Sequence, residues 1–513
     1  MIATAKTLPA QNAPPLDAAD IITRCLMSSP PWTWAHLTPE ATAARTPGPL
    51  PASASPQRSL RWAPLRFAAL LALVLAASFA LTGPAQSGAL DVFTTFAWSA
   101  YAVVAVWGVR GAFHLRALPE TPSAARTSEH VDIVLPTILR ASVLPALFRV
   151  IDACLVWSGR HLDHFTIEVV TEAGAEGIDA LAARYVGCAT LHLVIVPADY
   201  RTSKGTRFKA RANEYALELA RAEGRVGSDR WRYHLDDDTA PGPGTFAAIA
   251  EFINANPGSW PLAKHLAQGV LTFPHQLAPS IVPRLLDAIR PSDDRTRFAF
   301  FTGAKGTPRA GLHGEHLLVR ASVEDAIGWD FGPSVSVEDA YFGLTFAARY
   351  PGRSAFLPAY CYGASPANVT DLLRQRRRWA QGLLALLFDR TMPLRGKAHL
   401  SVFILGWTVG VFQYVGVVLA VALVTGESTS PVARAVVVVW AFSMTYQAWS
   451  YLEGMAVNLA VSHHPTRRSA ALHYLLILPS MYTVVVLESV GSILGAWQWA
   501  RGVRTFDVIA KGR

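Results

Sequence analysis

RWRYHLDDDT, at residues 230–239, is an apolar, strand-like run that ends in three consecutive aspartates. Three comparable runs precede it, at 131–138, 165–173 and 191–197, and segments with the apolar spacing of helices lie between them. This alternation predicts an α/β domain with a parallel, Rossmann-like sheet. Ligands of such sheets bind at the carboxyl ends of the strands, where we expect the three aspartates to lie.

Carboxylates gather at these strand ends and again about a hundred residues later in the chain. Asp236 and Asp238 stand one residue apart, a spacing that can hold Mg²⁺ or Mn²⁺ against a diphosphate. Glu172 ends an earlier strand at the same expected edge of the sheet. Glu338 and Asp339 form the later pair, which can supply a base or can act only as first-turn acids of the helix that follows.

A third pattern lies in LLRQRRRWAQG, an amphipathic segment that precedes an apolar one. Helical geometry places Gln375, Arg378 and Trp379 on one face, at positions i, i+3 and i+4. That face can carry a guanidinium group for a diphosphate and an indole platform for a sugar. Arg376 and Arg377 point elsewhere, and we expect them to contact anionic lipid headgroups. A membrane-surface helix with no catalytic role would show the same pattern.

The composition indicates a membrane protein. Hydrophobic residues make up 51% of the 513 residues, charged residues 16%, and the mean hydropathy is +0.26, which is more apolar than is usual for a soluble domain. Four segments are long enough to cross a bilayer, namely 67–83, 92–109, about 400–426 and 432–451. A fifth, 471–500, is interrupted by Pro479 and Glu488, and we expect the break at Pro479 to produce a re-entrant or two-pass hairpin.

Basic residues flank the expected spans on one side, which predicts a multi-pass protein of the plasma membrane with its globular part in the cytoplasm. The net charge of +9 is assigned to membrane lipids and not to nucleic acid, because the basic residues do not gather in one stripe. The expected order is a disordered cytoplasmic arm at 1–60, two transmembrane helices in 61–113, the globular domain at 128–390, further transmembrane helices in 398–500, and a basic cytoplasmic tail at 501–513.

The four cysteines are scattered, with no spacing typical of a metal or redox site. They are Cys25, Cys154, Cys188 and Cys361. We expect them to be small buried apolar side chains of a protein in a reducing compartment.

The three patterns, in this order, resemble those of the membrane-integrated family 2 glycosyltransferases, the group that includes cellulose, chitin and hyaluronan synthases. The stretches YRTSKGTRFKARANEYALE, YHLDDDT and IGWDFGPSVSVEDAYFG are more narrowly similar to the egghead-type β-1,4-mannosyltransferases. The resemblance covers roughly residues 128–390 and implies a GT-A nucleotide-sugar domain inserted between transmembrane helices. Each pattern alone is weak evidence, whereas all three in order between apolar segments are strong evidence.

The resemblance also implies a role for each site residue. Asp339 takes the position of the general base, although Val337 stands where the family usually has a threonine. Asp236 and Asp238 match the metal-binding pair. The residues matching nucleotide-sugar contacts are Glu172, Lys209, Asp236 and Asp237, and those matching acceptor or diphosphate contacts are Glu338, Gln375, Arg378 and Trp379. Glu172 replaces a family aspartate that contacts the nucleobase, which leaves the identity of the base open.

The implied function is inverting transfer of a hexose from GDP-mannose or a UDP-hexose to a lipid-linked or saccharide acceptor, with Mg²⁺ or Mn²⁺ as cofactor. One base and no carboxylate placed as a nucleophile favour a single displacement that gives a β-linkage. The alternative enzyme is a processive polysaccharide synthase that extrudes its product. A nonenzymatic membrane scaffold or transporter would explain the apolar segments but not the carboxylates.

Overall fold

The computed structural model describes residues 5–6, 62–81, 89–114, 124–333, 335–392, 394–412, 431–462 and 467–503. Most of the arm expected at 1–60, the second half of the span expected at 400–426 and most of the tail expected at 501–513 lie outside these residues, as does Cys25.

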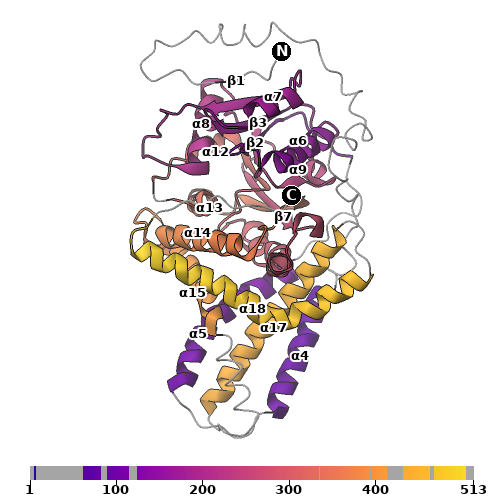
Figure 1. Cartoon of the computed structure of the whole chain (residues 1–513), viewed down its shortest axis with the longest axis vertical. Coiled ribbons are helices and arrows are strands. Elements are labelled where there is room, and N and C mark those ends of the chain that lie inside the picture. The colour runs from indigo at the N-terminus through magenta and orange to yellow at the C-terminus, as the bar shows by residue number, and fades with distance from the viewer. Residues whose placement is uncertain are drawn as a thin grey trace.

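A nine-stranded mixed sheet forms the centre of the globular part, with the order β1-β4-β3-β2-β5-β8-β7-β9-β6 (Figure 1). The strands are β1 Ala5–Lys6, β2 His130–Pro136, β3 Phe165–Glu172, β4 Leu191–Val196, β5 Arg230–His234, β6 Ala240–Pro241, β7 Leu266–Thr272, β8 Leu317–Arg320 and β9 Ser354–Tyr362. Strands β2 to β5 confirm the four predicted strands and pair in parallel. The sheet departs from the prediction at β8, which is antiparallel to both β5 and β7, because periodicity along the chain does not reveal which strands pair.

Helices cover the sheet and form a separate layer below it. In the globular part they are α6 Leu144–Ser158, α7 Ile178–Arg184, α8 Phe208–Ala222, α9 Thr245–Asn254, α10 Ile281–Leu286, α11 Arg290–Asp293, α12 Ala321–Ile327 and α13 Glu338–Arg349, with short η2 His275–Leu277, η3 Asp287–Ile289, η4 Asp294–Phe298 and η5 Phe300–Ala304. The others are α4 Ala63–Leu81, α5 Ala89–Phe113, α14 Val369–Phe388, α15 Leu394–Thr408, η6 Val409–Phe412, α17 Pro431–Ala460 and α18 Arg467–Ala500. Helices α6, α7 and α8 confirm those predicted between the first four strands.

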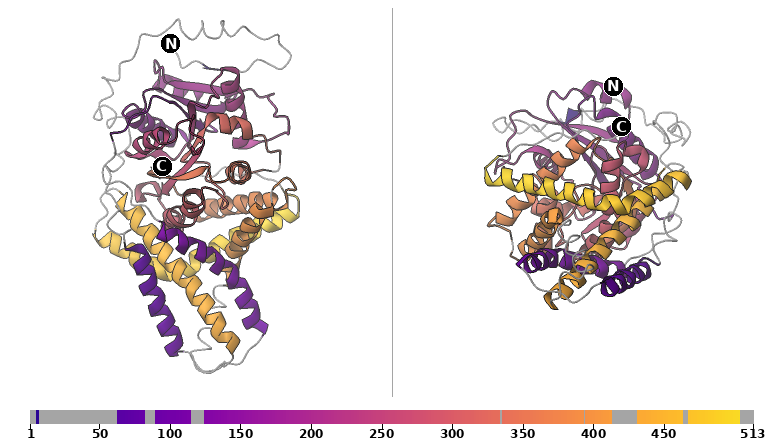
Figure 2. Two further views of the ribbon diagram at one scale, coloured as in Figure 1. Left: turned by 180° about the vertical axis from the view of Figure 1, so that it is seen from behind. Right: turned by 60° about the horizontal axis from the view of Figure 1, so that its bottom comes forward.

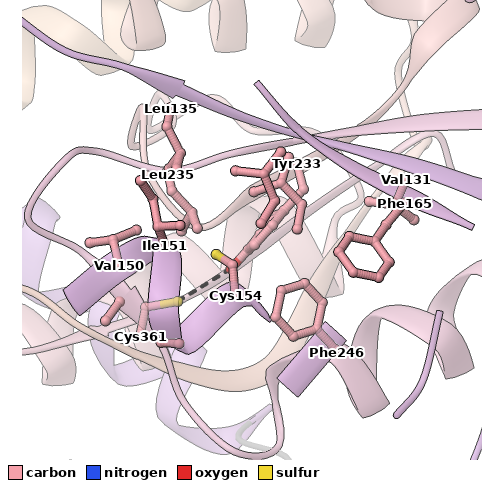
Figure 3. Close-up of a cluster of buried hydrophobic side chains, with 14 of the residues drawn as sticks. Val131, Leu135, Val150, Ile151, Cys154, Phe165, Tyr233, Leu235, Phe246 and Cys361 are labelled. Carbon is pink, nitrogen blue, oxygen red and sulfur yellow. Dashed lines mark hydrogen bonds between the residues drawn. The ribbon is translucent and has the colours of Figure 1, made fainter. Parts of the chain in front are cut away.

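The apolar core lies against one face of the sheet, where strands β2, β3 and β5 meet helices α6 and α9 (Figure 3). Alternate residues of a strand face the same side, so Val131 and Tyr233 point into this core. Each fully buried side chain of this size stabilises the fold by about 1.5–3 kcal/mol. Cys154 and Cys361 are buried here, as predicted, and Cys188 is half-buried at the edge of the core.

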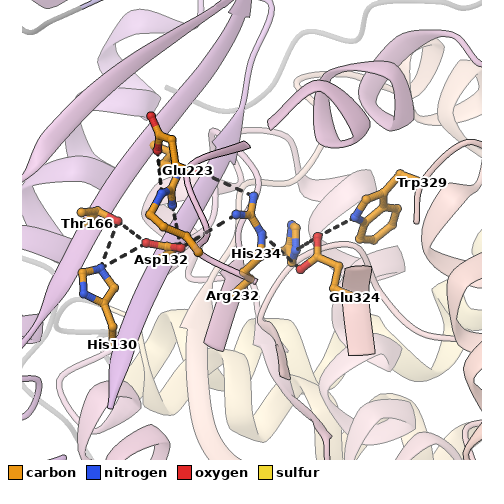
Figure 4. Close-up of polar contacts among 10 residues, drawn as sticks. His130, Asp132, Thr166, Glu223, Arg232, His234, Glu324 and Trp329 are labelled. Carbon is orange, nitrogen blue, oxygen red and sulfur yellow. Dashed lines mark hydrogen bonds and ion pairs between the residues drawn. The ribbon is translucent and has the colours of Figure 1, made fainter. Parts of the chain in front are cut away.

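The opposite face of the same strands carries a buried ionic network (Figure 4). Arg232 of β5 is the register partner of Asp132 in β2, and its fully buried guanidinium group also lies 3.4 Å from Glu168 of β3 and 3.2 Å from Glu324 of α12. Buried charges are tolerated only when they are paired, so these contacts tie the three strands together in one register. That register brings the carboxyl ends of β3, β2 and β5 to one edge of the sheet.

Helices α4, α5 and α17 extend away from the sheet, and α14, α15 and α18 lie between the two parts (Figures 1 and 2). Arg66 of α4 donates two hydrogen bonds to Glu453 of α17, at 2.6 and 2.7 Å. Among the described residues, no single helix has both the length and the apolarity to cross a bilayer, although the two parts of α18 meet that criterion together.

Helix α18 is broken at residue 482, three residues beyond Pro479, where the break was expected, and its two parts, Arg468–Met481 and Thr483–Ala500, meet at 52°, which is less than the reversal of a two-pass hairpin. The second part packs along α14, and two glycines allow the approach (Figure 2). A Cβ atom on Gly491 would lie 2.6 Å from the Cβ of Arg376, and one on Gly495 would lie 2.5 Å from the carbonyl oxygen of Arg377.

Candidate active site

A cavity of about 1010 Å³ lies at the carboxyl ends of β2, β3 and β5 and continues into the helical layer. At the sheet its wall includes Thr137, and at the far end it includes Trp407 of α15, Tyr451 of α17 and Glu488 of α18. All ten site residues predicted from the sequence line this one cavity: Glu172, Lys209, Asp236, Asp237, Asp238, Glu338, Asp339, Gln375, Arg378 and Trp379. The fold therefore brings together residues that are up to about two hundred positions apart in the chain.

Three carboxylates form a cluster at the end of β5. Asp236, Asp238 and Glu315 each offer an oxygen within 4.8 Å of the others, and Asp238 is buried. Hard divalent cations such as Mg²⁺ and Mn²⁺ prefer oxygen ligands, so this donor set fits the cation predicted from the sequence. Thr239 donates a hydrogen bond to Glu315, which orients that carboxylate.

The sequence prediction missed Glu315. Strand β8 pairs with β5 so that Trp231 lies opposite Arg320 and His234 opposite Leu317. Continuing this register by two residues places Glu315 opposite Asp236. The antiparallel pairing of β8 with β5, which makes Glu315 a neighbour of Asp236, could not be predicted from the sequence.

Asp237, the middle aspartate, connects two strand ends. Its Oδ2 accepts a hydrogen bond of 2.6 Å from Oγ1 of Thr137, which follows β2. Glu172, at the end of β3, forms an ion pair with Arg211 of α8, and half of its side chain remains exposed. Arg211 also donates to the carbonyl oxygen of Pro197, at 2.7 Å, so this acid is held firmly in the cavity wall.

Lys209, in the first turn of α8, lies at the centre of the acidic region. Its ammonium group donates to Asp236 and to the carbonyl oxygen of Gly314, at 2.9 Å, and lies 3.8 Å from Glu338. Burial alone would lower the pKa of Lys209, but the carboxylates of Asp236 and Glu338 raise it above its usual value. The lysine is therefore a fixed positive charge inside the cavity and not part of a solvated helix face.

Glu338 and Asp339 begin helix α13 and face the carboxylate cluster. The Oδ2 atom of Asp339 accepts a hydrogen bond from the backbone N–H of Gly314, and Oδ1 accepts one from Ala340, both at 2.8 Å. Each carboxylate oxygen keeps a further lone pair for a ligand proton. Burial raises the pKa of Glu338 to about 7, and the neighbouring Asp339 adds to the effect.

The Gln-x-x-Arg-Trp segment lies in α14, with Gln375, Arg378 and Trp379 on the cavity side as predicted. The expectation that Arg376 faces lipid headgroups is wrong. Its guanidinium group is 1% exposed, forms ion pairs with Asp287 at 2.9 Å and Glu488 at 2.7 Å, and lies 4.4 Å from the centre of the Trp379 ring. Helix α18 covers the face of α14 that sequence periodicity assigned to the membrane surface.

Comparison with known proteins gives the following relatives. The family model for glycosyl transferase family group 2 matches residues 231–492. The beta-1,4-mannosyltransferase egh of Drosophila melanogaster is 27% identical over 275 residues, which are 53% of this chain and 54% of the relative. The beta-1,4-mannosyltransferase bre-3 of Caenorhabditis elegans is 28% identical over 216 residues, which are 42% and 45%. This chain therefore spans about half the length of the curated relatives it matches.

Among solved structures, the mannosyltransferase PcManGT from Pyrobaculum calidifontis, in complex with GDP-Man and Mn²⁺, has a TM-score of 0.43 and 17% sequence identity. The match covers 75% of this chain and 99% of that one. TarS 1–349 of S. aureus, in complex with UDP, has a TM-score of 0.30 and 12% identity, and the match covers 73% of this chain and 92% of that one.

Proposed function

The chain belongs to glycosyl transferase family group 2, and on this premise we propose that it transfers a hexose from a nucleoside-diphosphate sugar to a lipid-linked or saccharide acceptor, with inversion. The relatives named beta-1,4-mannosyltransferases favour mannose as the hexose and GDP-mannose as the first donor to test.

One observation carries the proposal: the cation-binding carboxylates, the candidate base and the Gln-x-x-Arg-Trp face share one cavity. Gly314 connects the first two groups, because its N–H holds Asp339 and its carbonyl oxygen holds Lys209 against Asp236. A nonenzymatic scaffold or transporter has no need for a base beside a cation site.

The donor would lie with its diphosphate at the carboxylate cluster. Asp236, Asp238 and Glu315 would hold Mg²⁺ or Mn²⁺, which when bound supplies positive charge to the leaving diphosphate. Lys209 and Arg378 add positive charge from the protein on two sides of the cavity. Glu172, at the end of β3, and its partner Arg211 of α8 lie where the nucleoside would bind in a parallel sheet of this kind.

The transfer step requires that the acceptor oxygen attack the anomeric carbon while the bond from that carbon to the diphosphate oxygen breaks. The bonding electrons leave with the nucleoside diphosphate, and the acceptor hydroxyl proton passes to Asp339. A carboxylate positioned in this way contributes roughly a hundredfold or more to the rate. A single displacement converts an α-linked donor into a β-linked product.

The acceptor would enter from the helical layer, where the cavity wall includes Trp107 of α5, Phe403 and Trp407. These aromatic side chains suit a sugar with an attached lipid. We propose that the apolar helices lie in the plasma membrane with the globular domain in the cytoplasm. Thiols introduced near Ser87 and Ser428 should then react with an impermeant reagent in intact cells, and a thiol near Thr466 should not; labelling at Thr466 would contradict this orientation.

The test is a donor screen with the purified full chain, using GDP-mannose and UDP-hexoses with Mg²⁺ or Mn²⁺. Release of nucleoside diphosphate that increases with added acceptor supports transfer, and the anomeric coupling of the product by NMR gives the linkage. An α-linked product would refute the inverting mechanism. Long polymer from a UDP-sugar alone would favour the polysaccharide synthase, and no turnover with any donor would refute the proposal.

A further inference from the structure

The cavity contains a histidine–aspartate pair that the transfer step above does not use. Nε2 of His313 lies 2.6 Å from Oδ1 of Asp294, which is 2% exposed. The other oxygen of Asp294 accepts a hydrogen bond of 2.9 Å from the backbone N–H of Leu271 in β7. The backbone N–H of His313 donates to Oε1 of Gln268, also at 2.9 Å. Both members of the pair are thus fixed by the sheet.

This geometry determines which ring nitrogen of His313 is available to a ligand. A carboxylate only accepts hydrogen bonds, so the nitrogen that faces Asp294 carries a proton. The remaining nitrogen, Nδ1, has no hydrogen-bond partner among the residues that the structure describes. The side chain is 18% exposed and lines the cavity, and the ring of Phe298 lies 4.3 Å from the imidazole, centre to centre.

The two residues that follow His313 contact groups of the proposed acceptor site. The next residue, Gly314, donates its N–H to Asp339, the proposed base. The residue after that, Glu315, lies 3.8 Å from Arg290, whose guanidinium group is 5.2 Å from the centre of the Trp379 ring. The segment 313–315 therefore lies between the proposed base and Arg290, the arginine beside Trp379.

We propose that His313 binds the acceptor sugar by a hydrogen bond between Nδ1 and a sugar hydroxyl, and that Asp294 is the positioning residue that orients the ring. The inference rests on the proposed function, because it needs an acceptor beside Asp339. A hydroxyl suits this place better than a phosphate, since Asp294 and Asp339 already supply negative charge.

Two substitutions separate ligand binding from structural support. His313→Gln places a polar atom at the ε position, where it can keep the contact with Asp294, but it has none at the δ position. His313→Asn places one at the δ position and loses the contact with Asp294. If Nδ1 binds the acceptor, His313→Gln should raise the acceptor KM about tenfold, as expected for one lost hydrogen bond, and His313→Asn should recover part of that loss.

The assay uses GDP-mannose as donor and a panel of alkyl glycosides and disaccharides as acceptors, with the full chain. The KM for GDP-mannose should stay within about twofold of wild type in His313→Gln, because Nδ1 is proposed to contact the acceptor and not the donor. His265→Gln, a histidine outside the cavity, is the matched control and should leave both KM values unchanged. Thermal midpoints of all variants check that the fold is intact.

Three results would overturn the inference: an unchanged acceptor KM in His313→Gln, an equal rise in the KM for GDP-mannose, or a loss in His313→Asn at least as large as in His313→Gln. In each case turnover by the wild-type chain would leave the proposed function standing. No transfer by the wild-type chain to any acceptor would count against the proposed function and the inference together.

Discussion

Replacing Arg376 with methionine tests whether this residue joins α14 to α18 or faces lipid. Methionine keeps much of the side-chain volume but removes the charge that Asp287 and Glu488 share. Asp287 is 1% exposed and would be left in an apolar surrounding without its charged partner. Glu488 retains a hydrogen bond of 2.9 Å from Nε1 of Trp407, so most of the penalty falls on Asp287.

The magnitude follows from these burial values. Removing one partner of a buried ion pair costs about 3–5 kcal/mol, whereas an exposed pair contributes about 0–1 kcal/mol. Arg374 provides the matched control on the same helix, because its side chain is 49% exposed and its partner Asp371, at 3.1 Å, also accepts a hydrogen bond from Asn368. We therefore expect Arg376→Met to lower the free energy of unfolding by several kcal/mol and Arg374→Met by less than about 1 kcal/mol.

Urea denaturation in detergent, followed by tryptophan fluorescence, measures the difference. The triple variant Arg376→Met, Asp287→Asn, Glu488→Gln should recover much of the lost stability, since no uncompensated charge remains. Equal effects of Arg376→Met and Arg374→Met would refute the buried ion pair. Destabilisation of Arg376→Met only in vesicles that contain anionic lipid would restore the headgroup interpretation.

Further predictions concern the base, the cation and the contact between α14 and α18. Asp339→Asn should lower the transfer rate roughly a hundredfold or more while the KM for the nucleotide sugar stays within a few-fold; comparable loss of donor binding would show that the base is misassigned. Asp238→Ala should abolish activity, and adding Mg²⁺ or Mn²⁺ should not restore it. Full activity of the wild-type chain in chelator would contradict a cation requirement. Gly495→Val should destabilise the protein by about 1–3 kcal/mol in urea, because its Cβ would lie 2.5 Å from the backbone of α14; an unchanged midpoint would exclude a close contact.

The parallel half of the sheet could be predicted because it depends on local order. Each of β2 to β5 is an apolar run with a helix before the next, and such units pair in parallel with their carboxyl ends together. The placement of Glu172 and Asp236 followed from that rule. Glu315 and Arg211 could not be found in the same way, because their partners depend on the pairing of β8 with β5 and on the packing of α8 against β3.

The error at Arg376 has a related cause. Helical spacing correctly placed Gln375, Arg378 and Trp379 on the cavity side, but it did not show that Arg376 also borders the cavity or what covers that part of the helix. Gly491 and Gly495 indicate that another helix packs here, since two glycines four residues apart in an apolar helix allow a close approach. Glu488, one turn earlier, then supplies the charge that a buried arginine needs. A glutamate inside an apolar segment therefore predicts a buried basic partner.

Gly314 shows how one residue sets the spacing between the two chemical parts of the site. A Cβ atom there would lie 2.9 Å from Nζ of Lys209 and 3.2 Å from the Cβ of Asp339. Any side chain would push the lysine away from Asp236 or the base away from its backbone donor. In the proposed in-line displacement, the distance from the leaving diphosphate to the attacking hydroxyl would have to match that between the lysine and the base, because such a step tolerates little misplacement. On the proposed mechanism we therefore expect Gly314 to be needed for the spacing of these two groups, whereas its own backbone conformation does not require a glycine.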